Sequence, residues 1–74
     1  MRSIFGNYFI APARITNAGR VNAAVMECTP DKAEFYDLFF TGTDGVTEHV
    51  ESFQQIESAT EAAGNLNRRY YATV

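Results

Sequence analysis

The chain has 74 residues, is 46% hydrophobic and 14% aromatic, and carries a formal net charge of −3. This length allows one domain with a single core, here residues 1–74, and the apolar content excludes a disordered tail. The single cysteine excludes an internal disulfide, and one cysteine with one histidine excludes the usual four-ligand zinc site. Stability must therefore come from apolar packing, from a second subunit or from both. A lone cysteine favours a cytoplasmic location, and no apolar run reaches the roughly 20 residues of a membrane helix, so no membrane partner is expected.

Charge is distributed unevenly along the chain. Residues 1–26 contain three arginines and no acid, a net charge of +3, whereas residues 27–61 contain nine acids and one lysine, a net charge of −8. This asymmetry predicts a surface with separate basic and acidic regions. An acidic face that only keeps the protein soluble is the commoner outcome, and an acidic patch directed at a basic surface of a partner protein is the more specific one.

Four strands are predicted first, separated by turn signals. Glycine-containing hairpin turns are expected at residues 17–20 and 41–45, and a Thr-Pro-Asp-Lys turn at residues 29–32. Pro12 has no N–H to donate, so the first strand is expected to be an edge strand or to break in two. The short connections favour an antiparallel meander. The strands are predicted over residues 8–15, 21–29, 34–41 and 46–53.

The period of the apolar residues then changes to that of a helix. Apolar residues recur at steps of three and four from Ile56 to Tyr70, so a helix is predicted to begin at Gln54 or Gln55. Gly64 either ends this helix as a cap, which frees residues 69–74 for a short strand, or lies inside it at a cost of about 1 kcal/mol. The longer helix, to about Tyr71, is preferred. The predicted fold class is α+β: an antiparallel β-meander with one C-terminal amphipathic helix on one face, in the order ββββα, with or without the short terminal strand.

The segment EFYDLFF, residues 34–40, does not alternate between apolar and polar residues as a sheet covered on one side should. Its even-numbered residues Tyr36, Leu38 and Phe40 form the more continuous apolar set and are predicted to face the helix. Phe35 and Phe39 are then predicted to lie on the uncovered face, with Asp37 between them. An exposed apolar patch of this kind is typical of an interface.

A partner-binding site is therefore predicted with an aromatic centre and a rim of Asp37, Glu27 and other acids. Its members are Phe35, Asp37, Phe39, Glu34, Glu48 and Glu51. One alternative is that the N-terminal arm, with Phe5, Tyr8 and Phe9, folds over this face and makes it a second small core. Another alternative is a homodimer through the open face.

The chemistry-bearing residues form no recognisable catalytic or metal-binding motif, so no catalytic residue, metal or cofactor is predicted. His49 is interpreted as a surface histidine and Cys28 as a small buried residue. An enzyme is therefore not expected. Two arginines are followed by two tyrosines within residues 67–71, but a pI of about 4.9 disfavours nucleic-acid binding.

In layout the chain resembles small phage and mobile-element proteins, including anti-CRISPR inhibitors and anti-restriction proteins. The shared features are a small acidic single domain, a β-meander that ends here in Val50-Glu51-Ser52-Phe53, and one amphipathic helix over residues 56–63. The resemblance implies a stoichiometric inhibitor in the host cytoplasm that occupies a basic, nucleic-acid-binding surface of a host defence complex. The same layout occurs in DNA-arm-binding modules of phage integrases, which are usually basic. A homo-oligomeric accessory protein is the alternative from another class.

Overall fold

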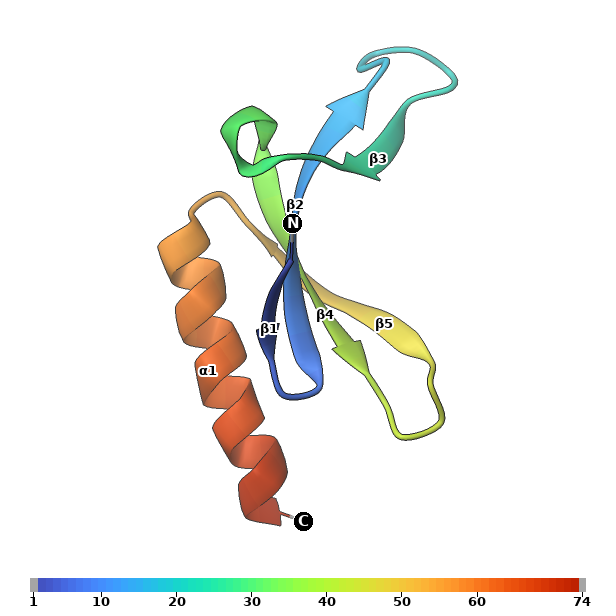
Figure 1. Ribbon diagram of the computed structural model, residues 1–74. Helices are drawn as coiled ribbons and strands as arrows, with labels where there is room; N and C mark the ends of the chain where they lie inside the picture. Colours follow the sequence, from blue (N-terminus) through green and yellow to red (C-terminus); the bar gives the residue numbers. More distant parts are fainter. Residues whose placement is uncertain (1, 74) are drawn as a thin grey trace.

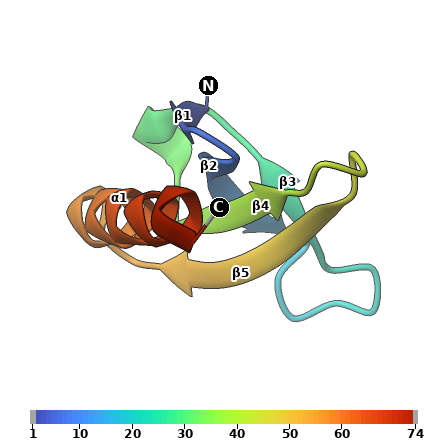
Figure 2. The same ribbon diagram turned by 90° about the horizontal axis from the view of Figure 1, so that it is seen from below.

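The computed structural model describes the backbone of residues 2–73 and the side chains of residues 2–70. Five strands form one antiparallel sheet, and a single helix lies along one of its faces (Figures 1 and 2). The elements are β1 (Ser3–Phe5), β2 (Tyr8–Thr16), β3 (Ala24–Glu27), the 3₁₀ turn η1 (Pro30–Lys32), β4 (Phe35–Thr41), β5 (Thr47–Phe53) and α1 (Ile56–Thr73). The predicted α+β fold with one C-terminal helix is confirmed, but the sheet is not a simple meander, because β2 pairs with β4 and β3 lies on the other side of β2.

The first strand, β1, was not predicted. It pairs with β2 through a two-residue hairpin turn in which Gly6 has a φ of 61°. A positive φ at the first central position is typical of a type II′ turn and favours glycine there. The Gly6-Asn7 step was therefore the sequence signal for this hairpin.

Strand β2 lies at the centre of the sheet, which corrects the prediction of an edge or broken strand. On one side it pairs with β4 over residues 8–13. On the other side β1 pairs with residues 8–10 and β3 with residues 13–16, so Pro12 falls between the two ladders. The Pro12 carbonyl accepts a hydrogen bond from the Cys28 N–H on that side (2.9 Å), and the missing N–H of Pro12 faces the same gap. The proline therefore removes no bond from either ladder.

The hydrophobic core lies between the sheet and α1. Ile10 and Leu38 are almost fully buried beneath Ala59 and Ala63, whose small side chains let the helix lie close to the strands. The prediction that Tyr36, Leu38 and Phe40 face the helix is confirmed. Leu38 and Tyr36 belong to this core, and the Phe40 ring lies 5.5 Å from the ring of Tyr70 on α1.

The helix is continuous through Gly64, as preferred from the sequence. The Gln55 carbonyl accepts a hydrogen bond from the Ala59 N–H (3.2 Å), so Gln55 occupies the N-cap position and the helix begins at Ile56, one residue after the predicted start. Of the alternative terminal strand over residues 69–74, residues 69–73 are helical and Val74 lies outside the described residues.

Strand β3 is shorter than predicted. Only residues 24–27 pair with β2; residues 21–23 belong to the loop of a hairpin that projects beyond the helix (Figure 1), and residues 28–29 connect β3 to η1. Val21 is fully exposed in this loop, whose chain turns through hydrogen bonds from the Arg20 N–H to the Asn17 carbonyl (3.0 Å) and from the Ala23 N–H to the Arg20 carbonyl (3.1 Å). The apolar alternation that suggested a longer strand therefore does not reflect burial.

Candidate functional site

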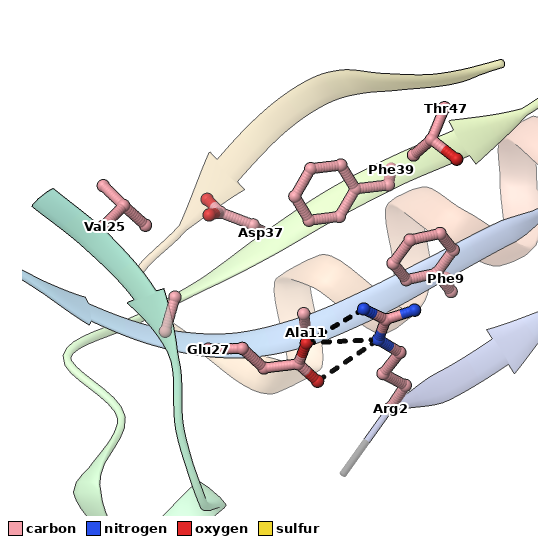
Figure 3. A pocket seen from close by; sticks show the side chains of 9 residues that line it. Arg2, Phe9, Ala11, Val25, Glu27, Asp37, Phe39 and Thr47 are labelled. Atoms are coloured by element: carbon pink, nitrogen blue, oxygen red, sulfur yellow. Dashed lines mark hydrogen bonds and ion pairs between the residues drawn. The ribbon is translucent and has the colours of Figure 1, made fainter.

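The face of the sheet opposite α1 carries a continuous concave surface, which we call the open face. Two adjoining hollows of about 360 and 510 Å³ lie on it and share Val25, Asp37 and Phe39 in their linings (Figure 3). Strands β2 and β4 supply its centre, because alternate residues of each strand point away from the helix. The open face consists of Arg2, Phe9, Ala11, Ala13, Val25, Glu27, Phe35, Asp37, Phe39, Thr47, His49 and Ser52.

An aromatic stack forms one end of the open face. The rings of Phe9 and Phe39 lie opposite each other in the β2–β4 ladder and stack with their centroids 5.0 Å apart. His49 meets Phe39 in a T-shaped contact at 5.5 Å, and the Arg2 guanidinium lies 4.6 Å from the centroid of Phe9. Both Phe39 and Phe35 are partly buried but keep contact with solvent. The predicted aromatic centre is therefore present on the face that the helix does not cover.

The N-terminal arm does not cover this face. Phe5 and Tyr8 pack against the core on the helix side of the sheet, whereas Phe9 is part of the open face itself. The arm is incorporated into the sheet as β1 and the first half of β2, so the alternative of a second small core sealed by the arm is wrong.

Asp37 is the most deeply buried polar side chain of the open face, with a residue exposure of 6%. The Ser52 hydroxyl donates a 2.6 Å hydrogen bond to its Oδ1 atom. The His49 Nε2 atom lies 3.3 Å from the same Oδ1 and 3.1 Å from the Ser52 hydroxyl oxygen. Sequence analysis missed this cluster and treated His49 as an isolated surface residue.

A β-bulge at Val50 explains why His49 and Ser52 meet. In a regular strand, residues three apart point to opposite faces. Here Ser52 pairs with Asp37 and His49 pairs with Phe39, while Val50 has no partner in the ladder. The extra residue restores both side chains to the same face.

The cluster differs from a Ser-His-Asp catalytic triad. In a triad the serine hydroxyl donates to one ring nitrogen of the histidine, and the carboxylate holds the other nitrogen. In this protein the Ser52 hydroxyl donates directly to Asp37, and the same His49 nitrogen approaches both partners. The arrangement therefore fixes the position of the Asp37 carboxylate and does not activate Ser52 as a nucleophile.

We predict that Ser52→Ala lowers the free energy of unfolding by about 1–3 kcal/mol, because the buried Asp37 carboxylate loses its shortest hydrogen bond. Chemical denaturation followed by circular dichroism measures the change. Ser58→Ala is the matched control, since Ser58 is exposed on α1. A loss at position 52 no larger than at position 58 would show that Asp37 does not depend on the serine.

An ion pair links the two short strands that share an edge of β2. The Arg2 side chain donates to both carboxylate oxygens of Glu27, with its shortest contact at 3.0 Å (Figure 3). These hydrogen bonds hold the pKa of Glu27 below its usual value and raise the pKa of Arg2. The pair is largely exposed, so its contribution to stability is small. Its main effect is to cancel one positive and one negative charge on the open face.

Of the predicted acidic rim, Asp37 and Glu27 line the open face, whereas the three other acids do not. Glu48 pairs with Phe40 and Glu51 pairs with Leu38, and directly paired residues share a face, so both acids lie on the helix side of edge strand β5. Glu34 is exposed, and its carboxylate accepts a 2.9 Å hydrogen bond from the Ile15 N–H at the end of the β2–β4 ladder. Of the six predicted site residues, the structure brings together only Phe35, Asp37 and Phe39 on the open face.

Arg2, Phe9, Val25, His49 and Ser52 belong to the open face but were not predicted as site residues. Phe9 carried a usable signal, since it lies in an apolar strand next to the core residues. The others depend on contacts between distant parts of the chain or on the bulge.

Comparison of the chain with protein-family models, with curated proteins and with solved structures gives no match. Within residues 2–70, no three histidine, cysteine or acidic side chains lie close enough together to hold a metal ion. The helix that the structure describes is not long and apolar enough to cross a membrane.

Proposed function

We propose that this protein is a non-enzymatic binding module that docks a partner protein on the open face. The observation that carries the proposal is the Phe9–Phe39 stack, which lies partly exposed on a concave surface that no described element covers. Aromatic residues at the centre of an interface usually provide most of the binding energy. A small domain gains little by leaving such side chains in water, so their position is better explained by a partner than by folding.

The proposed partner presents a basic surface. The Arg2–Glu27 pair cancels within the open face, and Asp37 remains as its other acid, with only Oδ1 contacted by Ser52 and His49. Glu48 and Glu51 lie on the neighbouring edge strand and are exposed, so they can meet basic residues that extend past that edge. Such charges mainly increase the rate of association.

The resemblance to phage inhibitors supplies the finer proposal. It makes this protein an inhibitor of the anti-CRISPR or anti-restriction type that binds the nucleic-acid-binding surface of a host defence complex and blocks it sterically. The acidic composition of the chain supports this proposal, because a nucleic-acid-binding surface is basic.

Affinity capture with matched baits tests the proposal. Immobilised wild-type protein is expected to retain a specific partner from a host lysate, and Phe39→Ala is expected to lose it. Val46→Ala is the control bait, because Val46 is an exposed apolar residue of the β4–β5 loop outside the open face. Equal retention by the Phe39→Ala bait, with the variant shown to be folded, would contradict docking on the open face.

A homo-oligomer is the second candidate function. It is favoured by Val25 of the open face and by its neighbour Met26, which both expose large apolar side chains on β3. Sedimentation at micromolar concentration separates the two candidates. A dimer that Phe39→Ala dissociates would support self-association through the open face, and a monomer would exclude it.

A further inference from the structure

The Asp37 carboxylate has one oxygen that the chain leaves unused. Both of its hydrogen-bonding neighbours, Ser52 and His49, approach the Oδ1 atom. The Oδ2 atom receives no hydrogen bond from any residue that the structure describes, although Asp37 is only 6% exposed. Among the described residues, the buried side-chain atom without a hydrogen-bond partner is Oδ1 of Asn67, so Oδ2 of Asp37 is open to solvent through the hollow. This atom is therefore a place where a donor from another molecule can bind.

The surroundings of this carboxylate are apolar. Val25, Phe35 and Phe39 line the hollow of about 510 Å³ in which Asp37 lies. The carboxylate projects from β4 in the direction of Val25 on β3 (Figure 3). The hollow therefore combines an anionic acceptor at its base with apolar walls around it.

Arg2, which also lies on the open face, does not fill this position. Arg2 binds the carboxylate of Glu27 and lies over the ring of Phe9. Arg2 thus contacts a carboxylate and an aromatic ring at the same time. A basic side chain bound in the Asp37 hollow would make the same two kinds of contact. At Asp37 the carboxylate and the aromatic rings are present, and His49 meets Oδ1 alone, so no basic side chain of the described residues reaches Oδ2.

We infer that the Asp37 hollow receives one lysine or arginine side chain of the partner protein. Its methylene stem packs against Val25, Phe35 and Phe39, and its charged group donates a hydrogen bond to Oδ2 of Asp37. Long basic side chains suit such a hollow because their stems are apolar and only their ends are charged. Ser52 and His49 keep Oδ1 occupied and so present Oδ2 to the ligand. This inference rests on the proposed docking function and names the chemical group that the partner inserts.

The test titrates the folded protein with N-acetyl-arginine amide, N-acetyl-lysine amide and the neutral N-acetyl-citrulline amide, followed by NMR. The arginine or the lysine probe is expected to give saturable shifts at Val25, Asp37 and Phe39. Loss of a hydrogen bond between charged groups weakens binding by about tenfold or more, so citrulline is expected to bind at least that much more weakly. Asp37→Asn is expected to weaken binding of the basic probe by a similar factor.

Two controls separate the site from general charge and from folding. Asp31→Asn removes the same charge at an exposed position outside the open face and is expected to bind the basic probe as the wild type does. The side-chain amide introduced by Asp37→Asn can still accept the Ser52 hydrogen bond, so the spectrum of this variant should remain that of a folded protein. Val25→Ser is a second test of the hollow. It removes an apolar wall and leaves the carboxylate in place, so it is expected to weaken binding of the basic probe.

Equal binding of citrulline and arginine, or unchanged binding by a folded Asp37→Asn, would overturn the inference. Shifts that appear when the protein alone is concentrated would also overturn it, since they would place a second copy in the hollow. The capture experiment distinguishes the two proposals. A partner that the Phe39→Ala bait loses and the Asp37→Asn bait retains would support docking on the open face and contradict this inference.

Discussion

Leu38→Ala is expected to lower the free energy of unfolding by about 2–5 kcal/mol, the range for removing a fully buried leucine side chain. Leu38 has 0% exposure and lies in the core with Ile10, Ala59 and Ala63. The loss is large in this chain because a domain of this size rarely has more than about 3–5 kcal/mol available from its core. Much of the variant is therefore expected to be unfolded at room temperature. Urea denaturation followed by circular dichroism measures the change.

Ile4→Ala is the matched control for this experiment. It removes a similar side chain from a residue that is 73% exposed on β1. Its effect is expected to stay within about 0.5 kcal/mol, as for most surface substitutions. Similar losses at positions 4 and 38 would show that the helix-side cluster is not the main source of stability.

Phe40→Ala is expected to lower the free energy of unfolding by about 3 kcal/mol, the lower end of the range for buried phenylalanines. The Phe40 ring lies 4.9 Å from that of Tyr8 and 5.5 Å from that of Tyr70, so it joins β2, β4 and α1. The same substitution at the neighbouring Phe39 is expected to cost about 1–2 kcal/mol, because it removes two aromatic contacts on a partly exposed face, the stack on Phe9 and the T-shaped contact with His49. Substitution of Phe40 is thus expected to affect mainly folding, and substitution of Phe39 mainly docking.

Thermal unfolding of both single variants, with Phe39→Leu as a conservative control, measures this difference. Phe39→Leu keeps an apolar side chain on the open face and is expected to unfold close to the wild-type temperature. A Phe39→Ala variant that loses as much stability as Phe40→Ala would mean that both faces of β4 belong to the core. The capture experiment would then need the leucine variant to test docking.

Local patterns predicted the fold because each depends on neighbouring residues. Because successive residues of a strand point to opposite faces, the prediction assigned Leu38 to the core and Phe39 to the other face, and both assignments are confirmed. The three-four spacing from Ile56 to Tyr70 predicted a helix that the structure confirms. Ala63 and Leu66, on either side of Gly64, pack on the core, and the helix continues through the glycine.

Features that depend on distant parts of the chain were not predictable in the same way. The position of Pro12 is tolerated because two short strands end on either side of it, and the chain order gives no sign that they share an edge. The Asp37 cluster depends on the extra residue at Val50, and a regular alternation would have separated His49 from Ser52. Glu48 and Glu51 are exposed, as expected for acidic residues. The face of the sheet on which they lie depends on how β5 pairs with β4, which the sequence pattern did not reveal.

The β-bulge at Val50 also affects the tendency of this chain to aggregate through the edge of its sheet. The outer rim of β5 carries unsatisfied main-chain groups that could template growth of the sheet from molecule to molecule. A bulged strand is a poor match for a straight one, and Glu48 and Glu51 would repel the same residues on an approaching copy. The irregularity that orients one carboxylate therefore also opposes fibre formation by a small, aromatic-rich protein.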